Sequence, residues 1–172
     1  PYFNTHETYH YYSLPVCHPT PIISLPLKLG QVLRGDRMAE SQYEIKFRED
    51  IGKTTLCPLT LHGPYIDAFH NAIEELYYFE MFIGGDLPVR GFVGQLEQRQ
   101  LPYTHKAFLW THLHFEFEYN GNQIVHATVS EKTEEVQLPV DDSSPERKID
   151  VTFSYYATWK ENTAIPFKLR HL

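Results

Sequence analysis

The stretch WTHLHFEFEYNGNQIVHATV, residues 110–129, decides the fold of this chain of 172 residues. After Trp110 the side chains alternate between two sets, which is the period of a strand with one buried and one solvated face. One face carries Thr111, Leu113, Phe115, Phe117 and Tyr119, and the other carries His112, His114, Glu116 and Glu118. Asn120-Gly121 then favours a two-residue type I′ turn, after which Ile124–Val129 returns. The stretch therefore predicts a β-hairpin whose aromatic face enters a core.

The register of this hairpin depends on which two residues form the turn. A turn at Asn120-Gly121 places Phe117 opposite Ile124, and a turn at Gly121-Asn122 gives Phe117 another partner. The turn at Asn120-Gly121 is favoured, because both central residues of a type I′ turn need a positive φ and Asn-Gly is the preferred pair there. The alternative stays open.

Other parts of the chain show the strand period or aromatic enrichment. Extended segments are predicted at Tyr43–Phe47, Leu56–Leu61, Tyr77–Ile83, Leu87–Phe92 and Ile149–Trp159, with a weak strand around Val136–Leu138. Pro58 is expected to break its segment, which would then be a short strand at a sheet edge. One short α-helix is predicted around residues 65–77, because Pro64 suits a first turn. Apolar residues then recur at intervals of three and four: Ile66, Phe69, Ile73 and Leu76.

Short aromatic strands, one short helix and frequent turns predict a mainly β fold. We expect one domain over residues 1–172, an antiparallel β-sandwich of jelly-roll-like form. A closed barrel is the competing architecture. The hydrophobic share of 42% and the aromatic share of 15% agree with a globular core.

The formal net charge of −7 argues against nucleic acid and anionic lipid surfaces as partners. No apolar run approaches the ~20 residues that a membrane-spanning helix needs. We expect both ends to be trimmed from a longer chain. No Asn-x-Ser/Thr triplet occurs, so N-glycosylation of this segment is not expected.

A candidate metal site lies on the polar face of the hairpin. His112, His114 and Glu116 share that face, and two imidazoles with a carboxylate can hold Zn²⁺ or Cu²⁺. The favoured interpretation is simpler: these side chains form the solvated outer face of an amphipathic hairpin. Beyond this candidate no metal and no cofactor is expected.

No catalytic residues are predicted. The serines lack a nucleophile elbow, and Cys17 and His18 are sequence neighbours that point apart in a strand. Glu116 and Glu118 could form the carboxylate pair of a glycoside hydrolase, but solvated charges explain them better. Arg34-Gly35-Asp36 spells an adhesion tripeptide, and a local turn is the favoured explanation.

The chain resembles the nonaspanins, also called the transmembrane 9 superfamily or endomembrane protein 70 family. The resemblance rests on five segments, in order, that cover nearly the whole chain. They are YYSLPVC (Tyr11–Cys17), LGQVLRGDRMAESQYEIKFRE (Leu29–Glu49), AIEELYYFEMF (Ala72–Phe82), DLPVRGFVG (Asp86–Gly94) and the hairpin of residues 110–129. The match is to the family's N-terminal lumenal region, without the membrane spans.

The resemblance implies a non-enzymatic domain on the lumenal or extracellular side of Golgi, endosomal, lysosomal or autophagosomal membranes. The implied function is sorting and trafficking of membrane proteins, with links to autophagy and adhesion. The implied partners are membrane-protein cargo and the protein's own transmembrane domain. A metal-binding lumenal domain and a carbohydrate-active β-sandwich are the alternatives.

Two cysteines, Cys17 and Cys57, are the whole thiol inventory. Composition alone leaves two buried free thiols and one disulfide equally open. The family resemblance favours the disulfide, because both cysteines fall in matching segments of a lumen-facing region.

Overall fold

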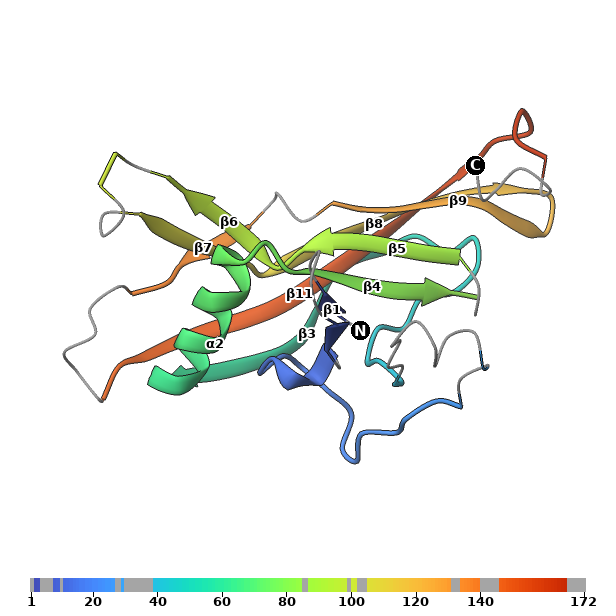
Figure 1. Cartoon of the computed structure of the whole chain (residues 1–172). Helices are drawn as coiled ribbons and strands as arrows, with labels where there is room; N and C mark the ends of the chain where they lie inside the picture. The colour runs from blue at the N-terminus through green and yellow to red at the C-terminus, as the bar shows by residue number, and fades with distance from the viewer. Residues whose placement is uncertain are drawn as a thin grey trace.

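The computed structural model describes residues 2–3, 8–9, 11–26, 29, 39–84, 87–98, 100–101, 105–130, 134–139 and 146–166. The described chain is mainly β, as predicted, with helix α2 (Gly63–Glu74) packed beside the sheets (Figure 1). The adhesion tripeptide Arg34-Gly35-Asp36 lies outside the described residues.

The strands form three sheets, each named here after a central strand. The β4 sheet has the order β2-β1-β4-β5: Thr8–Tyr9, Tyr2–Phe3, Tyr78–Ile83 and Leu87–Phe92. The β8 sheet has the order β3-β11-β8-β9: Ile51–His62, Lys148–Glu161, His112–Asn120 and Gln123–Ser130. The β7 sheet has the order β10-β7-β6: Glu135–Gln137, Lys106–Trp110 and Gly94–Glu97.

Figure 1 shows the β4 sheet lying across the β8 sheet, with the β7 sheet and α2 toward one end. The chain passes between sheets at single residues: Val93 separates β5 from β6, and Thr111 separates β7 from β8. The backbone at Thr111 stays paired, because its N–H donates to Glu134 and its carbonyl accepts from Ser154 at 3.0 Å. The layers are therefore joined by nearly continuous strands.

The strand pairing corrects the predicted all-antiparallel sandwich. β11 and β8 run parallel from Ser154 opposite His112 to Glu161 opposite Tyr119, so the β8 sheet is mixed. Parallel neighbours need a long connection, and here β9, β10 and the following segment supply it. The described strands form open sheets, so the closed barrel is wrong, and the jelly-roll form stays a prediction.

The helix is confirmed but its bounds are shifted from the predicted 65–77. Pro64 does lie in the first turn, and Ile66, Phe69 and Ile73 are buried. Leu76 was expected on the same buried face, yet it is 64% exposed. It adopts a φ of +56° just after the helix ends, so the chain has already turned toward β4.

The hairpin uses the alternative turn. Asn120 pairs with Gln123, so the two-residue loop is Gly121-Asn122, and Phe117 lies opposite Ala127 instead of Ile124. Gly121 has a φ of +63°, while Asn122 does not adopt a positive φ, so the expected type I′ geometry is not formed.

The strand predicted at Tyr43–Phe47 is wrong, because this segment forms no strand. Residues 41–47, called the strap below, belong to none of the described strands. The burial still alternates, because Tyr43 packs its ring edge-on to Phe115 and Tyr155. The alternation therefore indicates that one side of this segment is buried, and it does not indicate that the segment pairs with a neighbouring strand.

The predicted strand at Leu56–Leu61 is part of β3, which is an edge strand as expected. The expected break at Pro58 is wrong, because β3 runs through Pro58, which lies opposite Thr152 on β11. The strands at Leu87–Phe92, Ile149–Trp159 and Val136–Leu138 are confirmed as β5, β11 and β10, within one or two residues at each end.

Candidate functional site

The parallel pairing of β8 with β11 brings the predicted histidines together with side chains from the end of the chain. On one face of the β8 sheet, Ser154 lies beside His112 and Tyr156 beside His114. The next pair on that face is Thr158 beside Glu116. We call His112, His114, Ser154, Tyr156 and Thr158 the histidine face.

Each histidine is held by a hydroxyl and a ring. His112 Nδ1 lies 2.7 Å from Ser154 Oγ, and His114 Nε2 lies 2.9 Å from Thr158 Oγ1. The Tyr156 ring stacks on both imidazoles, with centroid distances of 5.1 Å to His112 and 3.8 Å to His114. These contacts fix the orientation of both rings.

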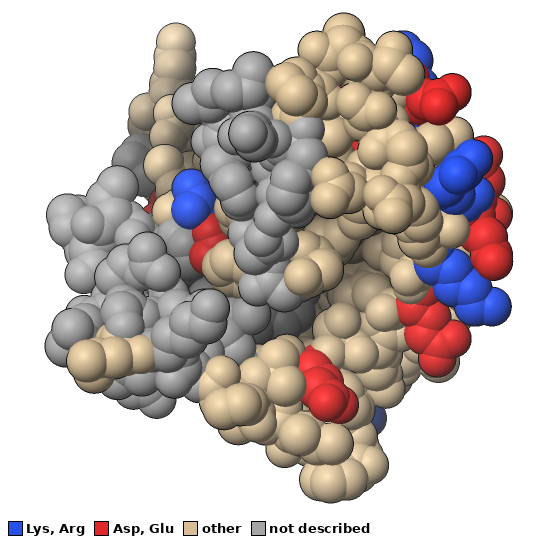
Figure 2. Space-filling view, turned by 90° about the vertical axis from the view of Figure 1, so that its right-hand side faces the viewer, with Lys and Arg blue, Asp and Glu red and all other residues tan. Residues whose placement is uncertain are grey.

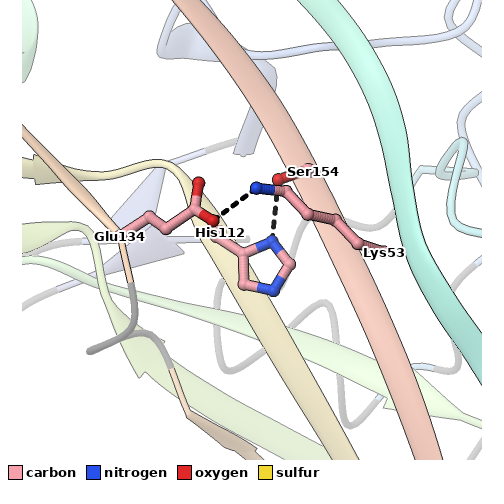
Figure 3. A network of polar contacts seen from close by, with 4 residues as sticks. All are labelled: Lys53, His112, Glu134 and Ser154. Carbon is pink, nitrogen blue, oxygen red and sulfur yellow. Dashed lines mark hydrogen bonds and ion pairs between the residues drawn. The ribbon is translucent and has the colours of Figure 1, made fainter.

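The expectation of a solvated face holds for Glu116, which is exposed, but is wrong for His112, which is only 3% exposed. Figure 3 shows Lys53 from β3 and Glu134, just before β10, beside His112. Lys53 and Glu134 form an ion pair. Residues far apart in the sequence thus cover a histidine that alternation alone places in solvent.

The electrostatics of the histidine face follow from this burial. Desolvation lowers the pKa of His112, the Glu134 carboxylate opposes that shift, and Lys53 and His114 add to it. The hydrogen bond from Lys53 lowers the pKa of Glu134. Near neutral pH His112 is therefore a neutral, hydrogen-bonded ring in the interior of the face.

The metal hypothesis gains no third ligand. Over the part of the chain that the structure describes, no group of three or more His, Cys, Asp or Glu side chains is placed to hold a metal ion. His112 and His114 each direct one nitrogen to a hydroxyl, and Glu116 is exposed. A metal site at His112, His114 and Glu116 stays a prediction for titration to test.

Ser154 and His112 are in hydrogen-bond contact and are residue types that serve as nucleophile and base in catalytic pairs. Both residues are buried, at 4% and 3% exposure, so a substrate has no access to the hydroxyl. Glu118, one member of the proposed carboxylate pair, accepts a hydrogen bond from Asn162 at 2.9 Å. The arrangement favours a structural role for these groups.

The sequence missed the partners of the histidines, although their signal was visible. Ser154, Tyr156 and Thr158 recur at every second position of the last strand and form its polar face. Another missed group is Glu80, whose side chain is 5% exposed and accepts from Arg90 Nε at 2.5 Å on the neighbouring strand. Strand alternation gives no sign of this cross-strand pair.

A disulfide joins Cys17 to Cys57, as the family resemblance implied. The two Cα atoms are 6.0 Å apart and the cysteines are separated by 40 residues. The bridge ties the segment that follows the 3₁₀ turn η1 (Tyr11–Ser13) to the edge strand β3. The two free thiols that composition left open are thereby excluded.

The fold and this bridge define a disulfide-linked β domain, and comparison with known proteins gives its family. The family model described as endomembrane protein 70 matches residues 8–171. The chain therefore belongs to the endomembrane protein 70 family, which is the transmembrane 9 superfamily. No solved structure matches the chain significantly.

The chain is similar to transmembrane 9 superfamily member 1 of Bos taurus, with 48% identity over 164 residues. That match covers 95% of this chain and 27% of the bovine protein. Member 1 of Mus musculus is 47% identical over 95% of the chain, and member 2 of Arabidopsis thaliana is 33% identical over 99%. The chain spans little more than a quarter of each relative: 27% of the mouse protein and 28% of the plant protein.

None of the helices within the described ranges is both long and apolar enough to cross a membrane.

Proposed function

We propose that this chain is a non-enzymatic lumenal domain that recognises membrane proteins during their sorting in the Golgi, endosomal and lysosomal system. The observation that carries the proposal is the family match over residues 8–171. The relatives are named for a transmembrane superfamily, and this region is about a quarter of their length. A compact β domain of such a protein is suited to contact other proteins at the membrane surface.

The disulfide supports the lumenal side. Cys17 and Cys57 are bridged, and disulfides persist in oxidising compartments such as the lumen of the secretory pathway. A reducing cytosol would leave the segment around Cys17 without its covalent tie to β3.

The histidine face supports a non-enzymatic role. Its polar groups satisfy one another through hydroxyl contacts and ring stacking, and His112 and Ser154 are closed to solvent. A catalytic site needs groups that reach a substrate. Here the polar groups instead fix the surface of a rigid sheet.

The lack of a glycosylation triplet allows a sharp test of the lumenal side. Asn122→Thr places a sequon at Asn120, the last residue of β8, next to the turn residues Gly121 and Asn122, which are exposed. We expect endoglycosidase-sensitive glycan addition when the chain is expressed within bovine member 1 in place of its own region. Asn122→Val is the matched control without a sequon. Absence of the glycan from a folded Asn122→Thr protein contradicts the lumenal assignment.

The sorting role is tested with the same chimera. In cells lacking member 1, the chimera should restore the distribution of membrane proteins between the Golgi, endosomes and cell surface. Member 1 without this region is the control, and it should fail to restore this distribution when microscopy shows it on the same membranes. Equal rescue by both proteins excludes recognition by this domain.

A further inference from the structure

An apolar cleft opens at the end of the molecule opposite α2. Its volume is about 320 Å³, which is the lower end of the range for ligand sites. It lies between the strap and the end of β4, and its large apolar lining includes Tyr43, Ile45, Phe47, Phe115, Ile124 and Trp159. Figure 2 looks onto this end, where the surface is hollowed near the centre of the view and most visible charged side chains lie along the right-hand edge.

The cleft runs along a backbone edge of β4. Met81, Phe82 and Ile83 all line it, although successive side chains of a strand point to opposite faces. A cavity that touches three consecutive residues, and Gly84 after them, therefore reaches the backbone at the end of the strand. β5 pairs with β4 along its whole length from Tyr78 to Ile83, so the cleft lies on the other side.

Within the described ranges, that other side of β4 is only partly paired. Among the described residues, β1 covers Tyr78 and Phe79 and no strand continues the ladder to Ile83. An open edge presents backbone N–H and C=O groups that can pair with another extended chain. The apolar cleft is thus bordered by a row of hydrogen-bonding groups.

The opposite wall of the cleft also carries polar groups. In the strap, the Glu44 N–H donates to the Tyr155 hydroxyl at 3.2 Å instead of to a strand. The indole nitrogen of Trp159 is buried and has no hydrogen-bond partner among the described residues. An aliphatic ligand such as a fatty acyl chain would leave the backbone groups of the β4 edge unused, whereas a peptide backbone supplies partners for them.

We propose that this cleft binds an extended peptide segment of a partner protein by strand addition to β4. Backbone hydrogen bonds to the open edge would supply affinity, and alternate apolar side chains of the peptide would enter the cleft. The net charge of −7 favours a segment with neutral or basic flanks. This inference rests on the proposed recognition function and gives it a binding mode. Its test measures binding by the chain alone, so it can fail while the sorting role stands.

The test uses the oxidised 172-residue chain and a fluorescein-labelled octapeptide that alternates valine and threonine and ends in lysine. We expect saturable binding by fluorescence anisotropy. Two further peptides carry backbone N-methyl groups at alternate residues, one set on each edge of the peptide strand. Methylation of one edge should abolish binding and methylation of the other should leave it nearly unchanged, because only one edge pairs with β4.

Ile124→Glu places a carboxylate in the cleft and should weaken binding about tenfold or more. Thr128→Glu is the matched control, because it adds the same charge to the exposed face of the same strand. Unchanged circular dichroism and thermal midpoint show that both variants fold. Absence of peptide binding overturns the proposal. Equal tolerance of N-methylation on both edges, or equal affinity for lauric acid in competition, also overturns it in favour of a general apolar site.

Discussion

The two ends of this domain use similar aromatic and aliphatic residues but differ in how closely they pack. At one end α2 inserts Phe69, which is fully buried, and places Ile73 so near Gly94 that an added Cβ would lie 2.7 Å from it. At the other end, among the described residues, the strap covers the gap between the sheets, and a cleft of about 320 Å³ remains. The core face of α2 is therefore closely packed, although a cleft of about 340 Å³ borders the helix at Tyr65 and Ala68, whereas the strap leaves a cleft between the sheets themselves.

The difference follows from geometry. A helix presents side chains at intervals of three and four on one face, so α2 supplies a continuous ridge to the sheets. An extended segment presents only every second side chain, and the strap directs Tyr43 and Ile45 inward while Glu44 and Lys46 are exposed. The closed end should carry stability, and the open end is free to carry binding.

The largest effect should come from the closed end. Phe69→Ala removes a ring that is 0% exposed, and the cavity left behind should lower the free energy of unfolding by about 3–5 kcal/mol. Tyr65→Ala on the same helix is the control, since Tyr65 is 50% exposed and should cost far less. Urea denaturation measures both. Equal losses would show that α2 does not close a packed core.

The disulfide should have the next largest effect. Replacing Cys17 and Cys57 with serine opens a loop of about forty residues and should lower the free energy of unfolding by roughly 3–4 kcal/mol in the chain-entropy model. Dithiothreitol should destabilise the wild-type chain and leave the double variant unchanged. Insensitivity of both proteins to the reductant would contradict the bridge.

The sequence predicts what depends on neighbouring residues. The alternation in residues 110–119 correctly places Leu113, Phe115 and Phe117 in the core, where each is 7% exposed or less. The three-and-four spacing likewise finds α2. Both patterns reflect the local geometry of a strand or helix relative to one apolar surface.

Contacts between distant segments could not be predicted in this way. No local pattern indicates that β11 runs parallel to β8, so the contact of His112 with Ser154 and the cover from Lys53 were hidden. The strap is a second example, because its alternation indicates which side is buried but not whether the segment pairs with another strand. The histidine pair was found from sequence, and its hydroxyl and ring partners needed the fold.

A smaller effect is expected from the burial of His112. Its pKa in the folded state is lowered from the ordinary value of 6.5, so the unfolded chain takes up this proton first as the pH falls. Stability is then fully present above about pH 6.5 and declines as the pH falls through the lowered pKa of the folded state. Denaturation at a series of pH values should show this decline in the wild type and a weaker one in His112→Gln. His126→Gln, at an exposed histidine of β9, is the control and should retain the wild-type decline. If the free energy of unfolding falls equally with pH in all three proteins, the decline does not come from the burial of His112.

The smallest effect should come from the open end. Phe47 lies edge-on to Trp159 at a centroid distance of 5.3 Å and to Tyr119 at 6.0 Å, but it is 40% exposed and borders the cleft. Phe47→Ala should therefore lower the free energy of unfolding by only about 1 kcal/mol, because its partners already face open space and little new cavity forms. The loss for Phe69→Ala should be at least threefold larger in the same urea experiment. Similar losses would mean that the strap packs as firmly as the helix, and the cleft would then lack the freedom that strand addition needs.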